Sequence, residues 1–165
     1  MSVFSRFFPV PAMLAMPSVG IDISDASVKY AELVMNRNQL ALGRFGEETL
    51  PAGVVASGGK IERPDELAKI ISKIKKKHGF VHVIASLPEE QAYVIRLLLP
   101  YMKVSEVRGS IELQLEEHVP LPPSDLIFDY DIARYPKNEK ETYEVSVAVM
   151  PRAITQSYLD VFTLA

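Results

Sequence analysis

The chain has 165 residues, close to the usual size of one globular domain, and its 48% hydrophobic residues supply enough material for a core. Its 18 Lys and Arg against 21 Asp and Glu give a net charge of −3, which does not favour nucleic acid or an anionic membrane as a partner. The chain has no cysteine, so a disulfide framework, a thiolate nucleophile and a cysteine zinc site are excluded, and a reducing cytoplasm fits.

Residues 1–17 form an apolar arm that Pro9 and Pro11 interrupt. A transmembrane helix needs about 20 continuous apolar residues, which the arm does not offer. A secretory signal peptide is the alternative, but the single cation Arg6, the prolines and the lack of a small-x-small cleavage site argue against it. We therefore expect an arm that folds over the domain or over a partner.

Three strands joined by short polar turns follow the arm. Apolar and polar residues alternate over residues 19–24, which predicts a strand with one buried face. Residues 28–35 are apolar enough for a strand covered on both faces, and a third strand at residues 40–45 follows the polar turn 36–38. The three strands predict an antiparallel meander.

A loop rich in glycine and proline, residues 50–59, leads to the clearest helix in the sequence. Pro64 stands at its first position, and Gly79 ends it after a basic run at residues 75–77. This basic run could also indicate nucleic-acid binding. A run of lysines at the negative end of the helix dipole explains the same residues without a ligand.

The next part of the chain predicts a βαββ unit. Strands are expected at residues 81–87 and 92–99, and Ser105 is the expected N-cap of a helix that prolines end at 120, 122 and 123. The buried stripe of this helix is Val107, Ile111, Leu115 and Val119.

Two alternating strands, residues 128–132 and 143–149, complete the βαββ unit, and Pro151 opens a last helix whose apolar face runs to Ala165. A helix that stops on its apolar side leads us to expect a piece of a longer chain. The predicted order is βββαβ, an inserted βαββ unit and a returning helix.

The turn after the first strand is the candidate site. An acid at a strand end, Asp22, a turn of small residues and Lys29 on the next strand could hold phosphate: turn amides face the anion, the lysine adds charge and the aspartate orients Mg²⁺. The turn joins two strands, so it is not a P-loop. The alternative is an ordinary hairpin in which Ser24, Asp25 and Ser27 bind their own backbone.

Other possible sites are weak. The histidines His78, His82 and His118 match no metal-binding spacing, and no nucleophile elbow occurs. Asp129 and Asp131 could imitate paired catalytic carboxylates, but strand periodicity places them on a solvated face.

The order of these elements resembles the PilM family, the actin-like proteins of type IV pilus assembly, which are related to the cell-division protein FtsA. The resemblance rests on five segments in order: VGIDISDASVK (19–29), LPAGVV (50–55), ASLP (85–88), EHVPLP (117–122) and VMPR (149–152). It implies an α/β, actin-like (RNase H-like) N-terminal half, in which a βαββ subdomain 1C is inserted into subdomain 1A. The implied boundaries are an arm at 1–17, subdomain 1A at 18–87, subdomain 1C at 88–150 and a returning 1A helix at 151–165.

The resemblance also implies two sites. Family members bind ATP with Mg²⁺ between two such halves, which makes Asp22 the metal-orienting acid and Lys29 the phosphate lysine. The phosphate turn comprises Ser24, Asp25, Ala26 and Ser27. The family also binds the N-terminal segment of PilN in a groove between 1A and 1C, and the groove rim comprises Glu117, His118, Val119, Pro120, Leu121 and Pro122.

Two features depart from the family pattern. Ser24 stands where the family loop usually has glycine, and the second phosphate loop and adenosine loop belong to the half that is missing here. We therefore expect this chain alone to bind no nucleotide and to catalyse no reaction.

The resemblance implies a cytoplasmic scaffold at the inner face of the inner membrane, which contacts PilN and other pilus platform proteins and reaches the membrane only through them. A homodimer of the chain is a further expectation. A phosphotransferase of the same superfamily and an interaction module without nucleotide binding remain as alternatives.

Overall fold

A computed structural model describes residues 18–36 and 39–165. The arm at residues 1–17 and the turn residues 37 and 38 lie outside the described residues. The elements are β1 (Ser18–Ile23), β2 (Ser27–Asn36), β3 (Gln39–Thr49), α3 (Pro64–His78), β4 (His82–Ala85), η1 (Glu89–Gln91), β5 (Tyr93–Leu99), α4 (Val104–His118), η2 (Pro123–Asp125), β6 (Leu126–Arg134), β7 (Tyr143–Pro151) and α5 (Arg152–Leu164).

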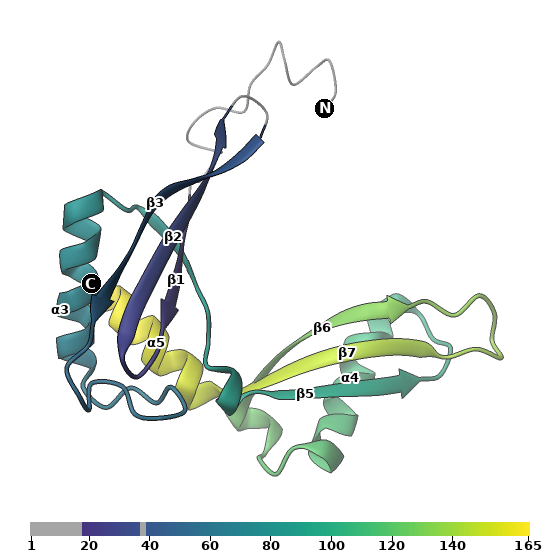
Figure 1. The fold of residues 1–165 in the computed structure, drawn as a ribbon. Coiled ribbons are helices and arrows are strands. Elements are labelled where there is room, and N and C mark those ends of the chain that lie inside the picture. Colours follow the sequence, from purple (N-terminus) through teal and green to yellow (C-terminus); the bar gives the residue numbers. More distant parts are fainter. Residues whose placement is uncertain (1–17, 37–38) are drawn as a thin grey trace.

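A four-stranded sheet in the order β3-β2-β1-β4 carries α3 and α5 on one face (Figure 1). The predicted antiparallel meander of β1, β2 and β3 is confirmed, and β4 joins β1 in parallel after α3. Alternate residues of β1 enter the core against apolar residues of α3 and α5, which the helix spacing of the sequence also predicted. Gly79 ends α3 in the left-handed conformation, with φ of 67°, as expected.

A separate three-stranded sheet in the order β5-β7-β6 is antiparallel throughout and packs one face on α4 (Figure 1). The predicted stripe of Val107, Ile111, Leu115 and Val119 is buried in its core. Asp129 and Asp131 are exposed, as the strand periodicity predicted. The βαββ unit is therefore confirmed, and it has a core of its own.

The predicted start of α4 was wrong by two residues. The helix begins at Val104, and Lys103 rather than Ser105 is its N-cap. The carboxylate of Glu106 accepts a hydrogen bond from the Lys103 backbone N–H at 3.1 Å, and the Lys103 carbonyl accepts one from the Glu106 N–H at 2.9 Å. A glutamate at the third helical position therefore satisfies the helix start without a serine cap.

The expectation that β2 is covered on both faces was also wrong. Leu33 and Met35 are 66% and 61% exposed. The register places Val19 of β1 opposite Glu32, so β2 beyond Leu33 pairs only with β3. The two strands extend past the rest of the sheet as a hairpin (Figure 1), and their apolar residues lie outside the core.

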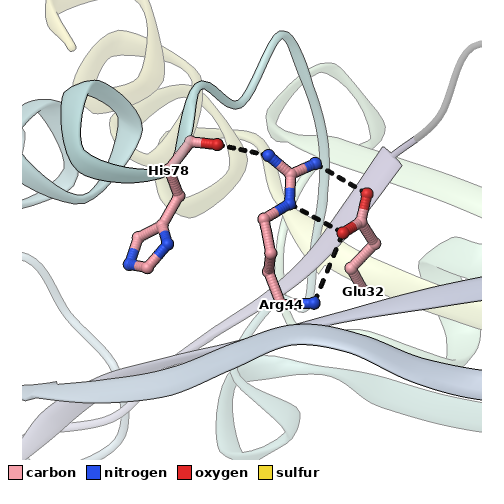
Figure 2. A network of polar contacts seen from close by, with 3 residues as sticks. All are labelled: Glu32, Arg44 and His78. Carbon is pink, nitrogen blue, oxygen red and sulfur yellow. Dashed lines mark hydrogen bonds and ion pairs between the residues drawn. The ribbon is translucent and has the colours of Figure 1, made fainter.

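Arg44 links this hairpin to the end of α3 and forms an ion pair with Glu32 (Figure 2). The two carboxylate oxygens of Glu32 accept hydrogen bonds from Nε and Nη2 of Arg44, each at 2.7 Å. The same guanidinium donates to the His78 carbonyl and lies 5.1 Å from the ring centre of Phe80. The Tyr30 hydroxyl and Nε2 of His78 are 2.8 Å apart, which adds a second link between β2 and α3.

The Glu32 ion pair makes stability depend on pH. The side-chain hydrogen bond from Arg44 lowers the pKa of Glu32 to about 2 from its ordinary 4.5. A lowered pKa stabilises the fold above the ordinary value, and the contribution is lost as the pH falls from 4.5 towards 2. We expect Glu32→Gln to lower the urea midpoint at pH 7 and the deficit to shrink as the pH falls through this window.

The control for this prediction is Glu48→Gln, since Glu48 pairs with Lys73 at the surface, at 3.3 Å. Exposed pairs contribute little to stability, so its urea midpoint should stay near that of the parent chain. A Glu32→Gln deficit of equal size at pH 7 and pH 2.5 would contradict the assignment.

Candidate functional site

The β1–β2 turn binds its own backbone through the Ser24 hydroxyl. This oxygen accepts hydrogen bonds from the backbone N–H of Ala26 at 3.3 Å and of Ser27 at 3.1 Å, and it donates to the Ser27 carbonyl at 3.1 Å. The ordinary-hairpin interpretation predicts such contacts for Ser24, Asp25 and Ser27, and the structure shows them for the Ser24 side chain. Two amides that a phosphate turn would offer to an anion are thus directed at Ser24 in this structure.

Asp22 lies at the carboxyl end of β1, beside the end of the parallel strand β4. Its Oδ1 accepts a hydrogen bond from the Ser86 hydroxyl at 2.6 Å, and the Ser86 N–H donates to the Ile21 carbonyl at 3.0 Å. Parallel pairing brings the two strand ends to one edge of the sheet, where ligands of open α/β sheets bind. The structure thus holds the carboxylate of Asp22 at such an edge.

Three chain segments enclose a cavity of about 410 Å³ at this edge, which we call the junction cavity. Its lining comprises Asp22, Ile23, Ser24, Asp25, Ser57, Gly58, Gly59, Ser86, Leu87, Pro88, Glu89 and Glu90. Four of these residues are acidic, and no lysine or arginine from the described ranges 18–36 and 39–165 lines the cavity. An anion would be repelled here unless a cation such as Mg²⁺ came with it.

Lys29 lies outside the junction cavity. It is the register partner of Asp22 on β2, and it lines the open face of the sheet together with Gly20 and Ile84. The structure therefore brings Asp22, Ser24 and Asp25 of the predicted set to the cavity, whereas Ala26, Ser27 and Lys29 do not line it.

The loop at residues 57–59, which lines the cavity, is held by contacts from η1 and from α5. The Tyr158 hydroxyl of α5 donates to the Gly59 carbonyl at 2.8 Å, and the Gln91 side chain donates to the Gly58 carbonyl at 3.0 Å. Burial, and then the charges of Asp22 and Glu90, raise the pKa of Tyr158 above 10, so the phenol keeps the proton that it donates. The Gln91 contact thus joins the loop that follows β3 to the segment that leads into β5.

Sequence reasoning missed this part of the site. Gly58 and Gly59 were assigned only to a loop, although a Gly-Gly pair marks a backbone that needs positive φ; the observed values are 81° and 77°. Ser86 and Tyr158 carried no local signal, because each acts through a contact with a residue far away in the sequence.

The predicted groove rim divides between core and surface. Val119 is buried in the core of the three-stranded sheet, and Leu121 packs against that core. Glu117, His118, Pro120 and Pro122 are exposed. None of these residues lines the junction cavity.

A second cavity, of about 470 Å³, is lined by residues that precede and follow this segment in the chain. We call it the Arg108–Arg152 cavity, and its lining comprises Arg108, Glu112, Leu115, Pro123, Leu126, Ile127, Phe128 and Arg152. The Arg108 guanidinium lies 4.4 Å from the ring centre of Phe128. Nε of Arg108 also lies 3.6 Å from Oε1 of Glu112, so the lining holds both signs of charge beside apolar side chains. Such a lining suits an extended peptide with apolar and charged side chains.

Arg152 lines this cavity and also lies where the chain passes from β7 of the three-stranded sheet into α5. It is the first residue of α5, directly after β7, and its Nε and Nη2 donate to the carbonyls of Ser124 and Leu126, both at 3.0 Å. The cavity therefore borders the point where the chain returns from the three-stranded sheet to the four-stranded sheet.

No helix in residues 18–36 or 39–165 is long and apolar enough to cross a membrane. The same ranges hold no group of three or more His, Asp or Glu side chains that could bind a metal ion.

Residues 20–163 match the family described as type IV pilus assembly protein PilM. The chain belongs to this family. Its fold also matches the solved PilM–PilN type IV pilus biogenesis complex with a TM-score of 0.78 and 20% identity, over 90% of this PilM-family chain and 44% of the matched chain. The chain thus spans less than half of that PilM structure.

A second match is the cytoplasmic domain of EpsL, an inner-membrane component of the type II secretion system of Vibrio cholerae. Its TM-score is 0.53 at 16% identity, over 88% of this chain and 51% of that domain. No curated protein sequence matches the chain. The structural matches confirm the α/β, actin-like fold that the family resemblance implied, with a βαββ unit inserted after β4.

Proposed function

We propose that this chain is a cytoplasmic scaffold unit of the type IV pilus platform at the inner face of the inner membrane, and that it binds the N-terminal segment of PilN. The observation that carries the proposal is the fold match to the PilM–PilN complex over 90% of the chain. Contacts with other platform proteins, and with the membrane through them, belong to the same proposal.

The Arg108–Arg152 cavity is the proposed place for the peptide. All of its lining residues are described, and Arg152 places it where the chain passes from β7 to α5. Pro123 of its lining directly follows the predicted rim, which ends at Pro122. Binding at this place needs no nucleotide, because no residue of the junction cavity contributes to its lining.

A charge change inside the cavity tests the proposal. Ile127 lines the cavity and is 38% exposed, so Ile127→Asp should fold while weakening a labelled PilN peptide by about 2 kcal/mol in fluorescence anisotropy, the scale of a binding hot spot. Val94→Asp is the matched control, because Val94 lies 71% exposed on the same sheet and does not line this cavity. Equal affinity of the two variants would place the peptide elsewhere.

The rim is tested by a pair of neighbouring charge reversals on α4. Glu117→Lys should change peptide affinity and its salt dependence, whereas Glu116→Lys, an equal change one residue away from the rim, should not.

Nucleotide binding is the second part of the proposal, and it concerns a full-length PilM-family protein that contains these residues. There Asp22 would orient Mg²⁺, the turn from Ser24 to Ser27 would approach the phosphates and Lys29 would add positive charge. The position of Asp22 at an edge formed by parallel strand ends supports this assignment.

An interaction module without nucleotide is the competing function, and two observations favour it. The Ser24 hydroxyl occupies the amides of Ala26 and Ser27, and the junction cavity is acidic. Calorimetric titration of the full-length protein with Mg-ATP separates the two functions, since only the first predicts saturable binding.

A further inference from the structure

The β2–β3 hairpin carries an apolar surface that no described residue covers. Five large side chains form it, each more than half exposed: Leu33, Met35, Leu40, Leu42 and Phe45. Leu33 pairs with Leu42 and Met35 with Leu40 across the strands, and Phe45 pairs with Ala31, so all five lie on one face. We call this surface the apolar hairpin face.

The apolar hairpin face lies opposite the helices. Tyr30 and Glu32, which alternate with Ala31 and Leu33 along β2, are buried on the side of α3. Contiguous apolar area of this kind on a folded chain generally marks a contact surface. We therefore expect another segment of the chain or another molecule to cover the apolar hairpin face.

Residues 1–17 join the fold beside this face. Val19 lies opposite Glu32, so Ser18, where β1 begins, lies level with Leu33. Residue 17 is covalently attached to Ser18, so residues 1–17 are tethered within reach of the part of β2 that has no β1 partner. Seventeen residues reach up to about 55 Å when extended, several times the about 15 Å that β2 covers between Ala31 and Met35.

The composition of residues 1–17 matches the face. The segment is rich in large apolar side chains: Val3, Phe4, Phe7, Phe8, Val10, Met13, Leu14 and Met16. Phenylalanine and methionine adapt well to an irregular apolar surface. Pro9, Pro11 and Pro17 lack the N–H that a strand partner of β2 would donate, which favours contact through side chains over an added strand.

We propose that residues 1–17 pack over the apolar hairpin face of their own chain and shield it from solvent and from other chains. The proposal does not depend on the binding of PilN or ATP. A second copy of the chain is the alternative occupant, and the experiment distinguishes the two.

The test uses pairs of introduced cysteines, which are specific because the chain has no native cysteine. Met13→Cys with Leu40→Cys should form a bismaleimide cross-link at least about tenfold faster than Met13→Cys with Glu116→Cys, where Glu116 is exposed on α4. Leu42→Cys replaces Leu40→Cys if the first variant folds poorly. Equal rates for the face and control pairs would overturn the proposal.

Isotope mixing identifies the occupant. When ¹⁵N-labelled and unlabelled chains are mixed, the proposal expects cross-linked peptides of one isotope only. Predominantly mixed products would show that a second copy covers the face, and the proposal would fail.

A dye measurement provides a second readout in the full chain. Phe7→Asp with Phe8→Asp should increase the fluorescence of an apolar-surface dye severalfold, and adding Leu40→Asp and Leu42→Asp should reverse the increase. Unchanged dye binding in the first variant would contradict shielding by residues 1–17.

Discussion

Replacing Gly59 by alanine is expected to destabilise the chain by about 2 to 4 kcal/mol, from a strained backbone and overpacking. Gly59 is buried with φ of 77°, and a Cβ at this residue would lie 2.2 Å from the Cβ of Pro88. Neither residue can move away easily, because Pro88 is buried and the Gly59 carbonyl accepts a hydrogen bond from the Tyr158 hydroxyl. Urea unfolding at neutral pH measures the loss.

The neighbouring Gly58 supplies the matched control. Its φ of 81° imposes a similar backbone strain, but an added Cβ would meet only the flexible Gln91 side chain, at 3.1 Å. Gly58→Ala should therefore cost only about 1 kcal/mol. The clash itself is isolated by combining Gly59→Ala with Pro88→Gly, which should recover part of the loss. Equal costs for the two alanine variants would mean that the loop does not pack against Pro88.

We expect residues 1–165 to bind Mg-ATP with a dissociation constant above about 1 mM. Three features oppose phosphate binding. The junction cavity is acidic, Lys29 lies outside it, and the Ser24 hydroxyl already accepts hydrogen bonds from two turn amides. Isothermal titration at millimolar nucleotide measures the affinity. Micromolar binding by these residues would overturn this account of the cavity.

Variants at Ser24 test why the turn binds phosphate poorly. In a full-length protein, Ser24→Gly frees the amides of Ala26 and Ser27 and should strengthen Mg-ATP binding about fivefold, near the net value of one hydrogen bond. Ser24→Ala frees the same amides but keeps the Cβ, so the difference between the two variants measures crowding. In the same protein, Asp22→Ala and Lys29→Ala should each weaken binding by about 1 to 3 kcal/mol.

The order of elements could be predicted from the sequence because it follows from local periodicity. The α4 stripe from Val107 to Leu115 and the alternation of β7 each reveal a buried face by themselves. The exposed end of β2 could not be predicted in this way. Whether Leu33 and Met35 are covered depends on where β1 begins beside them, which is a property of the register rather than of β2.

The candidate site was predictable only where its residues are close together in the chain. Asp22, Ser24 and Asp25 were found because they share one turn. The closing contacts, Ser86 to Asp22 and Tyr158 to Gly59, join residues 64 and 99 positions apart. A serine and a tyrosine at such separations give no local signal, so only the fold could bring them into the site.

Hydrogen–deuterium exchange of residues 1–165 with a PilN N-terminal peptide tests the central claim most directly. The account predicts slower exchange in residues 117–128 and at the start of α5 around Arg152, without added nucleotide. It also predicts no change in the β2–β3 hairpin. Saturating peptide that leaves residues 117–128 unprotected, or that protects only another surface, would contradict it.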